Sequence, residues 1–253
     1  MQFLISLITS MLVGSIAGYI GSLMITRRMA LVSGPLGHLA FPGVALALLL
    51  NFDLFLGALF SILLGAFLIW IFSLKAKAHF EALTAVIFTS MVAIGFLFLP
   101  LKNAEEALIG DITKVSIFDL LISFVLSISI FFVIRSIYSN MLLAEISEDL
   151  AKSLKVNIKR NDLIYMLCVA LIAALEVKLV GGLLTVAMIA IPAASALNLS
   201  KNLREYTILS TFFGLFSSIS GLLLFNLFNF PAGPMIILSN FFIFFISTLF
   251  AKK

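Results

Sequence analysis

The sequence has few charged residues, one cysteine and two histidines, and these scarcities exclude several classes of protein. Charged residues make up 11% and hydrophobic residues 62% of the chain, whereas a soluble domain has about 25% charged and about 45–50% apolar residues. A soluble globular fold is therefore excluded. The single cysteine, Cys168, rules out a disulfide within the chain. The net charge of +4 comes from basic residues in short polar connections, so we expect no nucleic-acid partner.

Catalytic motifs are also missing. The sequence contains no G-x-x-x-x-G-K-[ST] to hold nucleotide phosphates, no H-E-x-x-H and no G-x-S-x-G. It also has no paired carboxylates inside an apolar run. We therefore expect that the chain is not an enzyme and binds no cofactor of its own.

Apolar runs recur along the whole chain and predict an all-α polytopic membrane protein, a single transmembrane domain over residues 1–253. The first run lacks a basic start and a small-residue cleavage site, so we interpret it as a retained span. Residues 206–251 carry no charge and are too long for one span, and turn-forming residues between Asn226 and Pro234 divide them. The expected spans are 1–26, 36–51, 54–73, 82–99, 117–138, 163–178, 182–198 and the two spans within 206–251. That gives nine spans, or eight if one of the short ones is re-entrant.

The placement of basic residues predicts the orientation of the chain in the membrane. With the N-terminus outside, all but three of the sixteen Lys and Arg residues lie on the cytoplasmic side. The three exceptions are Lys102, Lys114 and Lys178. Cytoplasmic connections of membrane proteins are enriched in Lys and Arg. We therefore expect a multi-pass protein of the plasma membrane (the cytoplasmic, or inner, membrane) with a cytoplasmic C-terminus.

The apolar stretch 33–50 contains a histidine, His38, between two prolines, Pro35 and Pro42. If a helix runs inward from Arg28, His38 lies about 15 Å along it, near the middle of a hydrocarbon core about 30 Å thick. An imidazole there is costly unless it faces a cavity or a partner. The neighbouring prolines and glycines allow the helix to bend toward such a cavity. This pattern favours a residue that lines a transport path; the alternative is a histidine hydrogen-bonded between helices.

A short amphipathic helix is predicted at 147–157, in the longest polar stretch of the chain. Leu150, Leu154 and Ile146 share one face of it. Ser147 is suited to cap its start, and acidic residues fill its first turn. Such a helix either lies on the membrane surface or docks onto a soluble partner. Its acidic start favours docking, because anionic headgroups would repel it.

Five segments occur in an order and spacing that are characteristic in combination. They are RRMALVSGPLGHLAFPGVALALLL, EALTAVIFTSMVAIGFLFL, LIGDITKVSIFDLL, EDLAKSLKVNIKRNDLIYMLCVALIAALEVKLVGGLLTVAMIAIPAASA and FNFPAGPMIIL. On these segments the chain, from about Thr26 to Ser247, resembles the permease subunits of zinc-, manganese- and iron-type ATP-binding-cassette (ABC) importers.

The resemblance implies partners and roles. It implies a homodimer around a central path, two separate ATPase subunits that use ATP, and an extracytoplasmic binding protein that delivers the substrate. The predicted coupling helix, which docks onto the ATPase, comprises Glu148, Asp149, Leu150, Ala151, Lys152, Leu154 and Lys155. The predicted path is lined by His38, as a possible metal contact, and by Asn229 and Asn226. The outer loop for docking of the binding protein is predicted to present Glu105, Glu106 and Asp111.

Three positions depart from the family pattern. Gly34 replaces an acid that commonly stands four residues before the histidine, and Asn229 replaces the acid before the proline-glycine motif. Lys155 replaces the usual glycine of the coupling helix. Amides and an imidazole bind a divalent cation less tightly than carboxylates do. The identity of the metal therefore stays open, as do import of a chelate or another small solute and an ATP-independent carrier or channel.

Overall fold

The computed structural model describes residues 2–26, 37–75, 80–98, 110, 112–182 and 184–251. These residues fold into helices joined by short connections, and none of them forms a strand. The helices are α1 (Gln2–Thr26), α3 (Phe41–Leu50), α4 (Leu54–Lys75), α5 (Phe80–Phe98), the 3-10 helix η2 (Ile112–Lys114), α7 (Ile117–Ile146), α8 (Glu148–Ser153), α9 (Ile158–Val180), α10 (Thr185–Leu199), α11 (Leu203–Phe228) and α12 (Ala232–Leu249). The all-α prediction is confirmed.

Six of these helices, α1, α4, α7, α9, α11 and α12, are long and apolar enough to cross a bilayer. Three shorter apolar helices, α3, α5 and α10, occupy the predicted second, fourth and seventh spans. The count of nine crossings stays a prediction, since those three are short. The largest difference in bounds is at α7, where 117–138 was predicted and the helix continues to Ile146. The additional residues include the good helix formers Met141, Leu142 and Ala144, which extend the helix beyond its apolar part.

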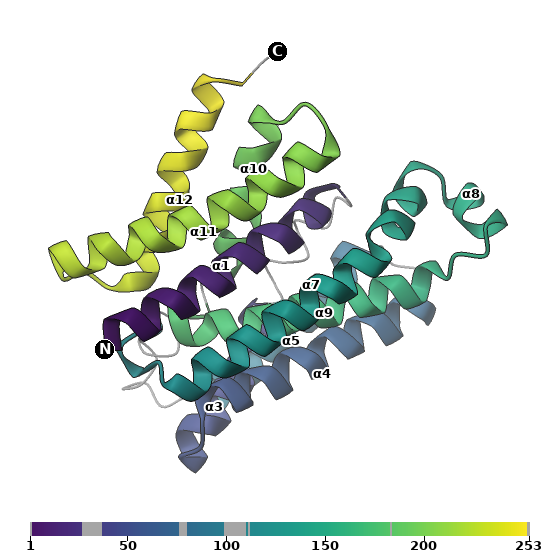
Figure 1. The fold of residues 1–253 in the computed structure, drawn as a ribbon. Coiled ribbons are helices and arrows are strands. Elements are labelled where there is room, and N and C mark those ends of the chain that lie inside the picture. Colours follow the sequence, from purple (N-terminus) through teal and green to yellow (C-terminus); the bar gives the residue numbers. More distant parts are fainter. Residues whose placement is uncertain are drawn as a thin grey trace.

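Helix α1 lies between two groups of helices, with α10 and α11 on one side and α7 and α9 on the other (Figure 1). Small residues bring α1 and α11 into close contact. A Cβ atom added to Gly14 or Gly18 would overlap atoms of Ser218 or Ser210, and the Ser210 hydroxyl donates a hydrogen bond to the carbonyl of Gly18. Close approach through small residues replaces the hydrophobic driving force that helices lack in lipid.

The two ends of the bundle differ in structure. At one end the start of α1 is tied to the segment before α7, because the Gln2 amide donates to the carbonyls of Thr113 and Val115. At the opposite end α7 leads into α8, which projects from the bundle (Figure 1). We call these the η2 end and the α8 end.

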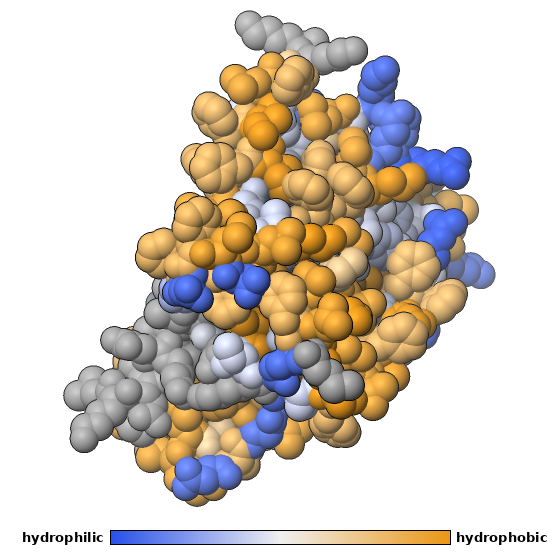
Figure 2. Space-filling view, turned by 60° about the vertical axis from the view of Figure 1, so that its left-hand side comes forward, coloured by the Kyte–Doolittle hydropathy of each residue, from blue (hydrophilic) through white to orange (hydrophobic). Residues whose placement is uncertain are grey.

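The surface between the ends is largely apolar. Figure 2 shows one face on which hydrophobic side chains predominate and hydrophilic ones gather in separate patches. Helix α7 is the least covered of the six long helices, because only 22% of its most apolar 18-residue stretch is buried. Large side chains such as Phe124 and Phe132 point outward from it. An exposed apolar surface of this extent requires lipid or further protein around it.

Candidate transport path and docking helix

His38 lies in a helical turn just before α3, at the level of the middle of α4. The next residue, Leu39, accepts a hydrogen bond from Ser61 at 2.6 Å and packs on Gly65. The His38 ring is half-buried and lies 5.3 Å from the ring of Phe88 and 6.1 Å from that of Phe41. These contacts hold the imidazole between α3, which carries Phe41, and α5, which carries Phe88.

The two nitrogens of His38 have different surroundings. The imidazole is hydrogen-bonded to the backbone of Gly182, and the adjacent Gly37 approaches Thr185 so closely that a Cβ atom there would overlap its hydroxyl. Nδ1 is buried and has no hydrogen-bond partner among the described residues. A fixed ring with one free nitrogen is the arrangement of an imidazole that can accept a ligand.

The chain around His38 is shaped by proline. Helix α3 begins at Phe41 with Pro42 in its first turn, where a proline needs no hydrogen-bond donor. The helix ends after ten residues at Asn51, which takes a left-handed conformation at φ 54°. A full span was predicted here for 36–51, whereas α3 is one of the short helices.

Asn226 and Asn229 lie on a different group of helices from His38. Both side chains are exposed near the end of α11, which packs against α1, α10 and α12, whereas α3 packs against α4 and α5. Asn229 ends α11 in a left-handed conformation at φ 55°. The described residues contain no group of three or more His, Cys, Asp or Glu side chains that could hold a metal ion. A path formed by His38 and these amides therefore stays a prediction.

The predicted docking loop for a binding protein falls outside the described residues. Glu105, Glu106 and Asp111 belong to the segments that the structure does not describe. Their role stays a prediction from the sequence.

A short helix is present where the coupling helix was predicted, but it is shorter than 147–157, and its coupling role stays a prediction. Helix α8 spans Glu148–Ser153, and the Ser147 hydroxyl accepts a hydrogen bond from the backbone N–H of Leu150, as the capping pattern predicted. The helix ends because Lys155 adopts a left-handed conformation, with φ 57°. Glycine reaches this conformation without steric cost. That geometry gives a physical reason for the glycine that the family pattern has at the position of Lys155.

An apolar patch on α8 is open to the surroundings. Leu150, Leu154 and Ile146 are 48%, 62% and 80% exposed. Beside them Lys152 pairs with Glu148 at 2.9 Å, and the hydrogen bond from this carboxylate raises the pKa of Lys152. Both charged side chains are more than half exposed, so the pair contributes little stability. Apolar side chains are therefore exposed where docking was predicted, and the docking role stays a prediction.

A charge cluster at the η2 end was not predicted. The Lys178 ammonium lies 2.8 Å from Asp119 and 3.3 Å from Asp53. Asp119 also completes a capping box with Ser116 at the start of α7. The order of the spans could have indicated this cluster. Asp53 and Asp119 lie at the starts of α4 and α7, and Lys178 lies near the end of α9, so all three belong to the same end of the bundle.

Glu176 lies inside the bundle. Its side chain is 0% exposed. Neither carboxylate oxygen has a hydrogen-bond partner among the described residues. It is two residues from Lys178, so the two side chains leave α9 on different faces.

Comparison with known proteins agrees with this architecture. The ABC 3 transport family matches residues 2–251. The manganese transport system membrane protein MntC of Listeria monocytogenes is 29% identical over 98% of this chain and 90% of its own length. The high-affinity zinc uptake system membrane protein ZnuB of Buchnera aphidicola is 27% identical over 98% of this chain and 97% of its own.

Solved structures share the fold. PsaBC from Streptococcus pneumoniae, in complex with Fab, superposes with a TM-score of 0.83 at 29% identity, over 96% of this chain and 89% of that one. An inward-facing putative metal-chelate type ABC transporter gives a TM-score of 0.74 at 19% identity, over 97% of this chain and 85% of that one, which shows the fold alone.

The fold and the apolar helices define a multi-pass permease of the plasma membrane. The chain belongs to the ABC 3 transport family.

Proposed function

We propose that this chain is the membrane subunit of an ABC importer for a divalent transition-metal cation, namely zinc, manganese or iron. The observation that carries the proposal is the match of the ABC 3 transport family over nearly the whole chain. Relatives that match from end to end are named for manganese and zinc transport. The Nδ1 atom of His38, which has no hydrogen-bond partner among the described residues, supports a path that meets a metal ion or a ligand of similar chemistry.

The machine is proposed to be a homodimer with separate ATPase subunits and an extracytoplasmic binding protein. The apolar patch of α8 supports docking of an ATPase, because it is exposed at the end of the bundle opposite the Lys178 cluster. Closure of the ATPase pair would move α8 and, through α7 and α9, switch the access of the path between the two sides of the membrane.

Import of a metal chelate by the same machine is the second candidate. It is favoured by Gly34 and Asn229, which stand where the family commonly has acids. A bare cation would then meet one imidazole and neutral oxygens in each subunit, which bind weakly.

The two candidates are separated by the ATPase activity of the reconstituted complex. The binding protein is supplied with manganese, zinc, iron or no metal, and the permease is wild type, His38→Ala or His79→Ala. The last variant is the control, because the sequence places His79 in a basic polar connection and not in an apolar run. Cation import predicts that one metal stimulates hydrolysis, that His38→Ala removes the stimulation and that His79→Ala retains it. Equal activity with every metal, unchanged in His38→Ala, would contradict the cation assignment and favour a chelate.

A further inference from the structure

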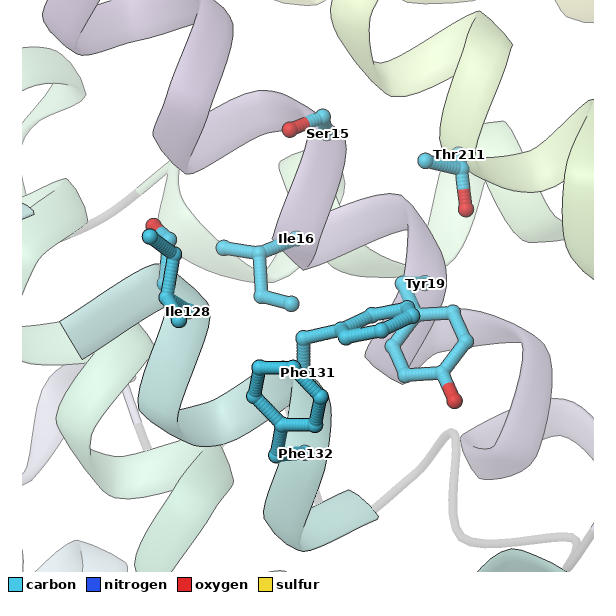
Figure 3. A pocket seen from close by; sticks show the side chains of 8 residues that line it. Ser15, Ile16, Tyr19, Ile128, Phe131, Phe132 and Thr211 are labelled. Atoms are coloured by element: carbon cyan, nitrogen blue, oxygen red, sulfur yellow. The ribbon is translucent and has the colours of Figure 1, made fainter. Parts of the chain in front are cut away.

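A groove of about 220 Å³ opens between α1, α7 and α11, on helices other than those that hold His38. Ile16 and Tyr19 of α1 form its floor, Phe131 and Phe132 of α7 form one wall, and Thr211 of α11 lies on the other side (Figure 3). The Tyr19 and Phe131 rings are 5.1 Å apart. Phe131 and Phe132 are 43% and 66% exposed, so the groove is open along α7.

The depth of the groove follows from the length of α7. This helix begins at Ile117, next to the charge cluster of Lys178 and Asp119, which marks a polar boundary. At about 1.5 Å per residue, Phe131 lies about 21 Å along the helix and Arg135 about 27 Å. The hydrocarbon core is about 30 Å thick. The groove therefore lies in the half of the bilayer nearer the α8 end, and Arg135 lies close to the headgroups of that leaflet.

Arg135 places a positive charge at the edge of the groove. Its side chain is exposed and close enough to Tyr19 to interact with it electrostatically. Within the described part of the chain Arg135 forms no ion pair. Toward the α8 end, beyond the residues that line the groove, a hydrogen bond of 2.9 Å between Tyr138 and Thr207 joins α7 to α11. The apolar groove matches the acyl chain of an anionic phospholipid, and the positive charge of Arg135 matches its phosphate.

We propose that this groove binds an acyl chain of an anionic phospholipid from the leaflet at the α8 end, with the lipid phosphate beside Arg135. An apolar cavity of roughly 150 Å³ is large enough to admit benzene, so the groove has room for a segment of acyl chain. Because α7 continues into α8, a lipid held here also positions the helix that carries the docking patch. The proposal does not depend on which substrate is transported.

The test is photolabelling of the permease in phosphatidylcholine vesicles. A small amount of phosphatidylglycerol or phosphatidylcholine carries a photoreactive group on one acyl chain, and labelled peptides are identified by mass spectrometry. Ser15→Phe fills the groove from α1, and Arg135→Gln removes the charge. Ser129→Phe adds the same bulk at an exposed position of α7 that does not line the groove and serves as the control. Size-exclusion chromatography establishes that each variant is folded.

Labelled phosphatidylglycerol is expected to modify the peptide around Phe131 about fivefold more than labelled phosphatidylcholine does, the preference that one basic residue gives near a membrane surface. Arg135→Gln should abolish the preference, Ser15→Phe should remove the label, and Ser129→Phe should behave as wild type. Equal labelling by the two lipids in the wild type, unchanged labelling in Ser15→Phe, or cross-links to a second chain in place of lipid would overturn the proposal. If Ser15→Phe does not fold, the comparison with the exposed Arg135→Gln still decides.

Discussion

Lys155 adopts a backbone conformation that suits glycine better than lysine. The left-handed conformation costs an L-residue other than glycine about 1–2 kcal/mol. Glycine avoids this cost, but it loses about 0.5–1 kcal/mol more in backbone entropy on folding, as measured in helices and strands. We therefore expect Lys155→Gly to leave the thermal unfolding midpoint unchanged or raise it slightly, and Lys155→Val to lower it. Equal destabilisation by both variants would show that the lysine side chain, and not its backbone angle, matters at this turn.

Glu176 is a second residue whose surroundings predict the outcome of mutation. Burying an ionised carboxylate without a partner is costly, and the described residues supply no partner to its oxygens. Glu176→Gln is therefore expected to fold as well as wild type, whereas Glu176→Lys should abolish the monodisperse peak in size-exclusion chromatography. A loss of folding in Glu176→Gln that matches the loss in Glu176→Lys would indicate that the carboxylate is charged and paired.

At the scale of elements, the charge cluster fixes the relative positions of α4, α7 and α9 at the η2 end. The Lys178 and Asp119 side chains are only 16% and 13% exposed, so removing one partner leaves a largely buried charge. Loss of a partner in a fully buried pair costs about 3–5 kcal/mol, and we expect about 2 kcal/mol here because water reaches the site.

Lys178→Met should therefore lower the unfolding midpoint, and Asp119→Asn in the same chain should restore part of the loss. A double-mutant cycle in detergent measures this coupling. Additive effects of the two substitutions would contradict a direct interaction.

The sequence predicted the helical elements of the whole molecule well, because apolar runs and polar breaks report directly on spans. Ser147 and Asp119 show that local capping rules also hold. Side-chain pairing across helices is different, since it depends on packing that no local pattern contains. For this reason the partners of Lys178 and the burial of Glu176 became visible only in the folded chain. Asn226 and Asn229 lie on a different group of helices from His38. A path that all three residues line would therefore need contacts beyond those of the described residues of one chain.

We propose that ATP hydrolysis in a separate subunit drives metal ions through this chain by way of α8. The most direct test is uptake of radioactive manganese, zinc or iron into vesicles that contain the permease, its ATPase and its binding protein. Leu150→Asp changes the exposed patch of α8, and Leu227→Asp, at a 72% exposed position near the end of α11, is the matched control.

We expect ATP-dependent uptake in the wild type and in Leu227→Asp. In Leu150→Asp uptake should fall at least about tenfold, which corresponds to about 1.4 kcal/mol in subunit docking. Size-exclusion chromatography should show that all three proteins are folded. Uptake that continues without ATP or without the ATPase would rule out an ATP-driven importer and identify an ATP-independent carrier.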